Sequence, residues 1–216
     1  MSTGELFELC TWQARVGGLD TAIQALQAAP RLQGDDGDGL VAAWTADAGP
    51  LNRLIHLWRY RGAPQRAQLH ATAAQGPTPP IDGCIGFSSE LLEPLPFSPP
   101  LRPRDLGSFH EFRIYTYPTS AIPDLVERWS PVIEWRQTLS PLVGAWITPA
   151  ATGSSLTRLM HCWAYRDANE WQAVRALARR SGRWPPPATG RPAAVLEQSS
   201  YVALPVSFAS PLNAER

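Results

Sequence analysis

The pattern of apolar and polar side chains predicts four strands and two helices in the first half of the chain. From residue 7 to residue 14 (FELCTWQA) the two kinds alternate with a period of two, which is typical of a strand. Between residues 19 and 29 the apolar positions follow helical spacing instead. By the same criteria we expect strands at residues 40–46, 51–60 and 84–92, and a second helix at residues 64–74.

The second half repeats this order. It opens with the alternating segment HEFRIYTY at residues 110–117. Further strands are predicted at residues 142–148, 156–165 and 195–204, and helices at residues 122–139 and 167–181. Each half therefore has the order strand, helix, strand, strand, helix, strand, which is that of a ferredoxin-like unit.

Two matching runs indicate that the chain arose by duplication. LNRLIHLWRY at residues 51–60 and LTRLMHCWAY at residues 156–165 share Arg, Leu, His, Trp and Tyr at the same internal spacing. We predict a first repeat at residues 1–98, a proline-rich linker at residues 99–108 and a second repeat at residues 109–212.

The alternation sorts the strand residues into two faces. One face is apolar and suits contact with helices, whereas the other carries charged and aromatic side chains. We expect the two polar-aromatic faces to meet, which gives an α+β fold of two ferredoxin-like repeats packed sheet to sheet as one barrel. The side chains predicted to line its interior are Glu8, Cys10, Trp12, His56, Trp58, Tyr60, Glu111, Arg113, Tyr115, His161, Trp163 and Tyr165.

Three motifs resemble the NIPSNAP family. HEFRIYTY is similar to the Tyr-Glu-Leu-Arg-x-Tyr opening of that family, and GPLNRLIHLWRY at residues 49–60 is similar to its Gly-Pro-Leu-Asn and His-x-Trp-x-Tyr signature. LEQSSYVALPVSFASPL at residues 196–212 resembles its closing strand and tail. The resemblance covers nearly the whole chain as two tandem units and implies the dimeric α/β-barrel fold. It implies no particular reaction.

Composition narrows the functional classes. The formal net charge is zero and all 19 basic residues are arginine, which argues against nucleic-acid or membrane partners and suggests a bacterial source. Three cysteines without a CxxC pair fit a reducing compartment, and we see no signal peptide, so we expect a cytoplasmic protein. Because the duplication supplies its own pairing, we expect a monomeric pseudo-dimer or a homodimer.

His56, His161 and Glu111 are the candidate catalytic residues. Each histidine could act as a general base, or could instead be a buried residue that holds the barrel together by a hydrogen bond. No carboxylate stands at the spacing that a metal site would need, so we predict neither a metal nor a cofactor.

Arg113 leads the candidate ligand-binding residues. Its planar guanidinium could grip an anion, or could form an internal salt bridge with Glu111, Glu8 or Glu197. The aromatic side chains beside it could stack a flat ligand or fill the interior. The full set of predicted ligand-binding residues is Arg113, Tyr115, Trp163, Trp58, Trp12, Glu8 and Glu197.

Two functional hypotheses remain open on the sequence. The first is a small-molecule site in the barrel, which could be that of a cofactor-independent accessory enzyme of bacterial metabolism with an aromatic or anionic substrate. The alternative is a non-catalytic binding or interaction protein with a packed interior. A cavity of a few hundred Å3 beside Glu111, Arg113 and His161 would favour the first hypothesis.

Overall fold

The computed structural model describes residues 4–28, 38–71, 83–101, 106–149, 154–186 and 194–209. These residues form two compact units. Unit 1 holds the described residues up to Glu93 and those from Ala203 onward, and unit 2 holds Pro94–Leu101 and the described residues from 106 to 202.

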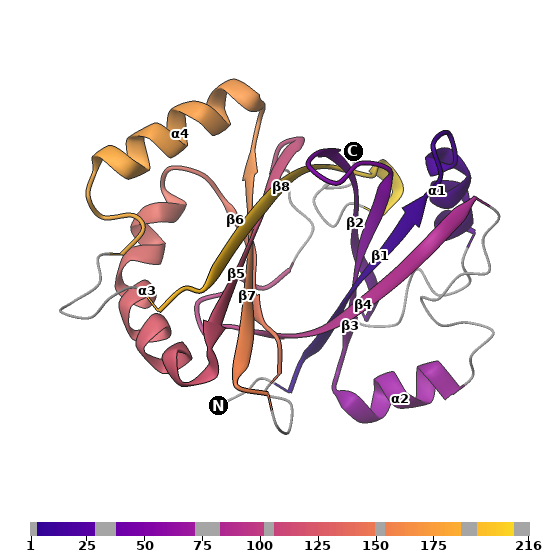
Figure 1. The fold of residues 1–216 in the computed structure, drawn as a ribbon, viewed down its shortest axis with the longest axis horizontal. Coiled ribbons are helices and arrows are strands. Elements are labelled where there is room, and N and C mark those ends of the chain that lie inside the picture. Colours follow the sequence, from indigo (N-terminus) through magenta and orange to yellow (C-terminus); the bar gives the residue numbers. More distant parts are fainter. Residues whose placement is uncertain are drawn as a thin grey trace. The chain divides into compact units, whose positions relative to one another are not determined.

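Unit 1 is a four-stranded antiparallel sheet with two helices (Figure 1). Glu8 lies opposite Trp58 and Cys10 lies opposite His56 in this sheet, whose strand order is β4-β1-β3-β2. Its elements are β1 (Leu6–Ala14), α1 (Leu19–Gln27), β2 (Gly39–Ala48), β3 (Arg53–Tyr60), α2 (Ala63–Ala71) and β4 (Cys84–Pro94).

Unit 2 repeats this arrangement with the strand order β8-β5-β7-β6. Glu111 lies opposite Trp163, and Arg113 lies opposite His161. Its elements are β5 (Phe109–Pro118), α3 (Ile122–Gln137), β6 (Leu142–Ile147), β7 (Leu156–Tyr165), α4 (Ala168–Arg180) and β8 (Glu197–Pro205), with short 3-10 turns at Thr119–Ala121 and Ser207–Ala209.

The predicted fold class is confirmed: the chain is α+β, with two ferredoxin-like repeats of the dimeric α/β-barrel class. The predicted strands and helices are all found, with bounds that differ by one or two residues. Parts of several predictions lie outside the described residues, namely residue 29 of the first helix, residues 72–74 of the second helix, residues 102–105 of the linker, and residues 1–3 and 210–212 at the outer ends of the two repeats.

The strand pairing shifts by one residue at equivalent positions in the two sheets. The pairing of β2 with β3 shifts between Leu40 and Ala42, and the pairing of β6 with β7 shifts between Leu142 and Gly144. In unit 2 this position requires glycine, because a Cβ on Gly144 would lie 2.2 Å from Cζ2 of Trp146. The duplicated repeats therefore share a local irregularity of the backbone as well as their strand order.

Each compact unit also contains a segment from the other sequence repeat. In unit 2, the amide of Leu95 donates a hydrogen bond to the carbonyl of Ala145 (2.9 Å). In unit 1, the amide of Val206 donates to the carbonyl of Ala43 (2.9 Å). The compact units are therefore not the two halves of the sequence, since the chain after β4 belongs to unit 2 and the chain after β8 belongs to unit 1.

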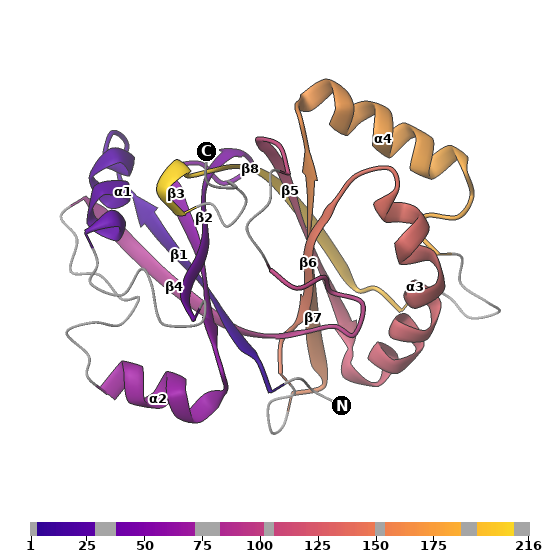
Figure 2. The ribbon, with the colours of Figure 1, turned by 180° about the vertical axis from the view of Figure 1, so that it is seen from behind.

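We predicted that the polar-aromatic face of each sheet points away from the helices, and this prediction is wrong. In each unit the helices cover one face of the sheet (Figure 1, Figure 2). In unit 1, Trp12 and Trp58 pack in one cluster with Leu26 of α1. In unit 2, Tyr115 and Trp163 pack with residues of α3, including Trp129, Leu125 and Ile133. The charged and aromatic strand residues therefore face the helices and do not line a barrel interior.

The more apolar strand face points away from the helices. Phe112 is buried on this face and stacks on Tyr201 of β8, with ring centroids 4.9 Å apart. Cys162 and Met160 are buried as well and alternate along β7 with the helix-facing His161. The prediction reversed the two faces because it assumed that helices always cover the most apolar side of a sheet.

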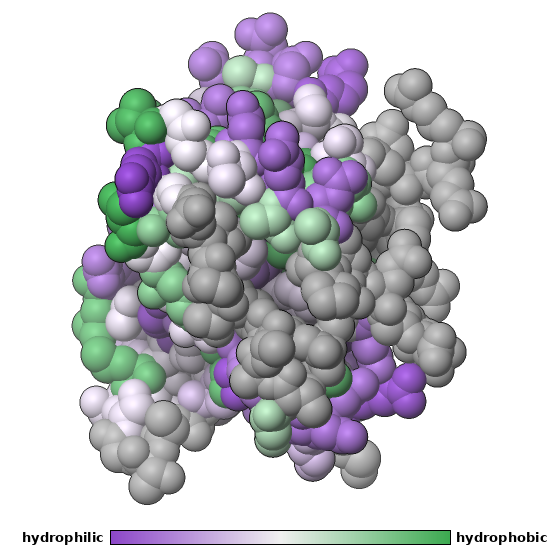
Figure 3. Space-filling model, turned by 90° about the vertical axis from the view of Figure 1, so that its right-hand side faces the viewer, coloured by the Kyte–Doolittle hydropathy of each residue, from purple (hydrophilic) through white to green (hydrophobic). Residues whose placement is uncertain are grey.

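The described surface carries few large hydrophobic side chains. Ile85 and Phe87 on β4 and Leu196 before β8 are among the exposed ones. Figure 3 shows one side of the molecule, where hydrophobic residues lie among hydrophilic ones. Every described helix is too short or too polar to cross a membrane.

Candidate functional site: a cavity between sheet and helices in unit 2

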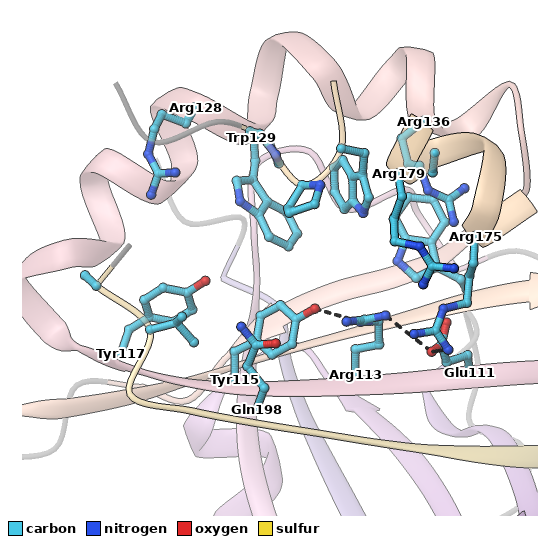
Figure 4. A pocket seen from close by; sticks show the side chains of 17 residues that line it. Glu111, Arg113, Tyr115, Tyr117, Arg128, Trp129, Arg136, Arg175, Arg179 and Gln198 are labelled. Atoms are coloured by element: carbon cyan, nitrogen blue, oxygen red, sulfur yellow. Dashed lines mark hydrogen bonds and ion pairs between the residues drawn. The ribbon is translucent and has the colours of Figure 1, made fainter. Parts of the chain in front are cut away.

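A cavity of about 370 Å3 lies between β5 and the helices α3 and α4 (Figure 4). It combines arginine side chains, aromatic rings and one carboxylate. Its charged and aromatic lining residues are Glu111, Arg113, Tyr115 and Tyr117 of β5, Arg128, Trp129 and Arg136 of α3, Trp163 of β7, Arg175 and Arg179 of α4, and Trp184.

Local sequence explains how these side chains reach one space. Alternate residues of β5, from Glu111 to Tyr117, project from the same face of the strand. On α3 the buried positions Leu125, Trp129, Ile133 and Arg136 follow helical spacing and form one stripe. An arginine thus occupies a position on α3 where an apolar residue would be expected.

Helix α4 is fixed at its first turn by Asp167. The Asp167 carboxylate accepts hydrogen bonds from the backbone amides of Asn169 (2.8 Å) and Glu170 (2.9 Å), which caps the helix. Arg175 and Arg179 follow at a spacing of four residues, so they project from the same side of α4.

Glu111 is the single carboxylate among the described residues that line the cavity. Its Oε1 lies 3.2 Å from Nη1 of Arg175 and 3.4 Å from Nη1 of Arg113. Its Oε2 accepts a hydrogen bond of 3.4 Å from the hydroxyl of Tyr165. Although Glu111 is 2% exposed, all of these contacts are long, and its two cationic partners are partly open to solvent.

Arg113 also holds Tyr115. Its Nε donates a hydrogen bond of 2.6 Å to the Tyr115 hydroxyl oxygen. Burial raises the pKa of Tyr115, and the nearby guanidinium of Arg113 only partly offsets this effect. The hydroxyl therefore keeps its proton at neutral pH, and this proton is available to a ligand oxygen, because the bond to Arg113 uses the hydroxyl as an acceptor.

Arg136 is a buried cation that pairs with no carboxylate in the described part of the chain. Its side chain is almost completely buried, at 2% exposure. Nη1 donates to Ser140 (2.7 Å), Nη2 donates to the Tyr165 hydroxyl (3.2 Å), and the guanidinium lies 4.1 Å from the ring centroid of Trp163. Nε has no hydrogen-bond partner, and no carboxylate of the described residues pairs with the group.

His161 lies behind the cavity wall and does not line it. It is in edge contact with Trp129 and Tyr115, with ring centroids 5.1 and 5.2 Å away. Its Nδ1 accepts a hydrogen bond of 2.6 Å from Nε1 of Trp163, so in the neutral ring the proton is on Nε2. Burial, followed by the charges of Arg113 and Arg136, lowers the pKa of His161 well below its usual range.

His56 has the same arrangement in unit 1. Its Nδ1 accepts a hydrogen bond of 2.6 Å from Nε1 of Trp58. Burial lowers its pKa from 6.5 to about 3, although the charge of Glu8 opposes the shift. Both histidines are therefore neutral at pH 7 and have no lone pair free to accept a proton, which supports a structural role for them.

The equivalent of Glu111 in unit 1 is Glu8, and it is fully engaged. Its carboxylate accepts hydrogen bonds from Arg66 through Nη2 (2.8 Å) and Nε (3.0 Å), and from Ser89 (2.5 Å) and Tyr60 (3.0 Å). Nε2 of His70 lies 3.0 Å from the same group. Trp12 and Trp58 pack in the adjacent core.

The structure thus brings four of the predicted site residues together, namely Glu111, Arg113, Tyr115 and Trp163. Of the others, Glu197 is exposed on β8, and its neighbour Gln198 lines the cavity instead. Prediction from sequence missed the helical half of the site. Its members are Arg128, Trp129, Arg136, Arg175 and Arg179. The arginine on the apolar stripe of α3 was a signal that could have revealed it.

The described residues show no cluster of side chains that could hold a metal ion. No group of three histidine, cysteine, aspartate or glutamate side chains converges anywhere in the part of the chain that the structure describes. The donors that face the cavity are mainly guanidinium groups, which bind anions and not cations.

Fold and site together define an α+β protein of the dimeric α/β-barrel class with a cationic, aromatic-walled cavity in its second unit. The chain belongs to the NIPSNAP family, because the NIPSNAP model matches it twice, at residues 7–99 and 110–210. The predicted family and its tandem duplication are both confirmed.

Curated relatives agree with this assignment. NipSnap homolog 2 of Homo sapiens is 24% identical over 152 residues, which cover 67% of this chain and 52% of the relative. NipSnap of Drosophila melanogaster is 23% identical over 153 residues, with 67% and 55% covered. The chain spans about half the length of the curated relatives it matches.

Solved structures share the fold at low sequence identity. A proposed monooxygenase of Fusobacterium nucleatum has a TM-score of 0.61 and 8% identity, with 95% of this chain and 94% of that chain covered. An anthrone oxidase-like protein has a TM-score of 0.58 and 10% identity, with the same coverage. At these identities the likeness concerns the fold alone.

Proposed function

We propose that unit 2 binds a small molecule with an anionic group and an aromatic or apolar body in the cavity between β5 and the two helices. The observation that carries the proposal is Arg136, a cation that is 2% exposed and has no carboxylate partner among the described residues. A buried charge is costly unless it is paired, so an anionic ligand is the missing partner.

The walls of the cavity support the second part of the proposal. Tyr117 and Trp129 face the cavity away from Glu111, and the rings of Trp163 and Trp184 complete an aromatic lining. Aromatic side chains of this kind stack against flat rings or cover apolar groups. At about 370 Å3 the cavity falls within the range of roughly 300–1,000 Å3 that is usual for small-molecule sites.

Two groups could act on a bound ligand. The Tyr115 hydroxyl can donate its proton to a ligand oxygen, and Glu111 lies on the other side of Arg113. Our further proposal of a cofactor-independent enzyme therefore rests on Glu111 and Tyr115. The histidines have no part in it, because both of them lie outside the cavity lining.

Thermal-shift measurements test the binding proposal. We expect aromatic carboxylates, such as benzoate and 1-naphthoate, to raise the melting temperature, because a ligand that binds the native state stabilises it. The corresponding amides have the same shape without the charge, and we expect them to have little effect. Equal shifts from acids and amides, or no shift from either, would refute an anion site.

Paired variants locate the binding site. Arg179→Ala removes an exposed arginine that lines the cavity, whereas Arg180→Ala removes the next arginine along α4, which does not line it. We expect only the first to weaken binding. Arg136→Gln should abolish binding, and circular dichroism would show whether this buried variant still folds. If Arg179→Ala and Arg180→Ala bind the acids equally well, the ligand does not occupy this cavity.

A further inference from the structure

Positive charge in the cavity is concentrated at one end. In Figure 4, Arg113, Arg136, Arg175 and Arg179 surround the end that holds Glu111, whereas Arg128 lies at the other end near Tyr117. Contacts of 3.2 and 3.4 Å tie Arg175 and Arg113 to Glu111, and Tyr165 links Arg136 to the same carboxylate. At this end, four of the five arginines among the described lining residues therefore stand against one carboxylate, an excess of three positive charges.

We propose that the ligand is an organic phosphate monoester, with its phosphate at this arginine end and its apolar body against Trp129 and Tyr117. The inference rests on the proposed function and narrows its ligand class. A monocarboxylate would offset only one of the three excess charges. A phosphate monoester carries close to two negative charges at pH 7 and offers three strongly accepting oxygens.

The donors at this end suit a tetrahedral anion. Arg113 approaches from β5, Arg136 from α3, and Arg175 and Arg179 from α4, so the guanidinium groups come from three different elements. The hydrogen bonds and ion pairs within the described residues engage two nitrogens of Arg113, two of Arg136 and one of Arg175. N–H groups therefore remain on several sides of the anion position, and a phosphate can accept from several directions at once.

The opposite end of the cavity restricts the ligand further. Arg128 is already paired there with Asp124, at 2.8 Å between Nε and Oδ2. Among the residues that the structure describes, this end therefore offers no unpaired cation, and Tyr117 and Trp129 dominate it. The ligand should have one charged end and one apolar end, which excludes bisphosphates and nucleotides with several charged groups.

Isothermal titration with three naphthalene derivatives tests the inference. The probes are 1-naphthyl phosphate, 1-naphthalenesulfonate and 1-naphthoate, which share one ring system. The sulfonate is tetrahedral like the phosphate but has a single charge. At pH 7.5 we expect the phosphate to bind roughly tenfold more tightly than either monoanion, if one additional charge contributes as much as one strong charge-assisted contact.

The pH dependence gives an independent readout. The second pKa of a phosphate monoester is about 6, so lowering the pH from 7.5 to 5.5 should weaken its binding several-fold as the dianion gains a proton. The charged and titratable groups around this end are Glu111, Arg113 and Tyr115 of β5, Tyr165 of β7, Arg136 of α3, and Arg175 and Arg179 of α4, with His161 of β7 behind Tyr115. Binding of the sulfonate reports any titration of these groups, because the sulfonate keeps its charge throughout.

The outcomes separate the two proposals. Tighter binding of the phosphate, lost towards pH 5.5 and reduced by Arg179→Ala but not by Arg180→Ala, supports a phosphate monoester site. Equal affinity for all three probes overturns this inference and leaves the anion site intact. No binding of any probe overturns the proposed function itself. Arg175→Gln provides a second variant, and it should narrow the preference for the phosphate over the sulfonate.

Discussion

Glu8 and Glu111 occupy equivalent positions in the two units, yet their surroundings differ. The Glu8 carboxylate is engaged by Arg66, His70, Tyr60 and Ser89 at 2.5 to 3.0 Å. The contacts of Glu111 are 3.2 to 3.4 Å long and open onto a cavity. One of the two equivalent carboxylates is thus part of an ionic network, and the other lies beside a space that a ligand can fill.

Two positions on the second helix of each unit account for much of this difference. The backbone amide of Arg61 donates to Gln65, and that of Arg166 donates to Glu170, both at 2.6 Å, which aligns α2 with α4. In this alignment Arg66 corresponds to Trp171, and His70 corresponds to Arg175. Two polar side chains of α2 therefore reach Glu8, whereas α4 offers Glu111 a single one.

Trp171 has a different role from Arg66. It packs on Phe109, with ring centroids 5.7 Å apart, and lies under the guanidinium of Arg175 at 4.9 Å. It therefore supports Arg175 without neutralising Glu111. At this position the helix of unit 1 thus supplies a cation to the carboxylate, and the helix of unit 2 supplies an aromatic ring instead.

Removal of each carboxylate should give the largest difference between the units. Glu8→Gln leaves Arg66 and His70 without their buried partner, and we expect it to lower the free energy of unfolding by about 3 kcal/mol. Glu111→Gln should cost about 1 kcal/mol, because its contacts are long and its partners can be hydrated from the cavity. Urea denaturation of both variants measures the two losses. Equal losses would show that the two networks do not differ in strength.

Acid should weaken unit 1 through Glu8. Burial alone would raise the pKa of Glu8, but hydrogen bonds from Arg66 and Ser89 outweigh it and lower the pKa from 4.5 to about 2. The folded state therefore favours the ionised form. Its contribution, about 3 kcal/mol, is present above pH 4.5 and is lost as the pH falls from 4.5 to 2.

Urea denaturation at pH 7, 5 and 3 checks this dependence. Burial also lowers the pKa of His56 from 6.5 to about 3, so its stabilising effect is present above pH 6.5 and is lost as the pH falls towards 3. In Glu8→Gln the decline below pH 4.5 should become shallower, and the decline between pH 6.5 and 4.5 should remain. An unchanged profile in this variant would contradict the assigned role of Glu8.

Replacing Arg66 or Arg175 should have a smaller effect on stability. The two positions are a matched pair, since each side chain is 27% exposed. Arg66 binds Glu8 through two nitrogens, whereas Arg175 reaches Glu111 through one. We expect Arg66→Ala to cost about 2 kcal/mol of stability and Arg175→Ala less than about 1 kcal/mol. Only Arg175→Ala should weaken anion binding. Weaker anion binding by Arg66→Ala alone would assign the ligand to unit 1. A larger loss of stability in Arg175→Ala than in Arg66→Ala would contradict the predicted difference between the two ion pairs.

The smallest expected effect of pH is on His56 and His161, because we expect neither imidazole ring to gain a proton between pH 8 and pH 5. Each accepts a hydrogen bond from a tryptophan two residues along its strand, and burial lowers both pKa values. We expect nitrogen NMR to show the tautomer protonated at Nε2 for both, with constant shifts from pH 8 to pH 5. A titration of His161 near pH 6.5 would restore it as a candidate general base.

Much of the fold followed from local sequence. Period-two and helical spacing placed the strands and helices within one or two residues, because each period reflects the geometry of a single element. The matching runs at residues 51–60 and 156–165 predicted the duplication, and the register of β3 and β7 is equivalent in the two sheets. The family followed from motifs that lie in single strands and in the residues directly beside them.

The site could be predicted only in part. Glu111, Arg113, Tyr115 and Trp163 were predicted because alternation puts them on one face of neighbouring strands. Arg136 and Arg175 were missed because they lie on helices, and no local pattern shows which strand residues a helix will cover. His161 was predicted because histidine can act as a general base. Its hydrogen bond with Trp163 and its burial suppress this property in the folded protein.

The sequence by itself determined the elements, their order, the duplication and the division of each strand into two faces. Only the tertiary structure decided which face meets the helices. The alternation of side chains along β5 predicts that Glu111 and Phe112 point to opposite faces of the sheet. It does not predict which of the two faces the helices cover. The choice of the covered face depended on the side chains that the helices present to the sheet, and α3 and α4 present arginine and tryptophan side chains. These groups pack against a charged and aromatic face, so the cavity formed on the side where an apolar core was expected.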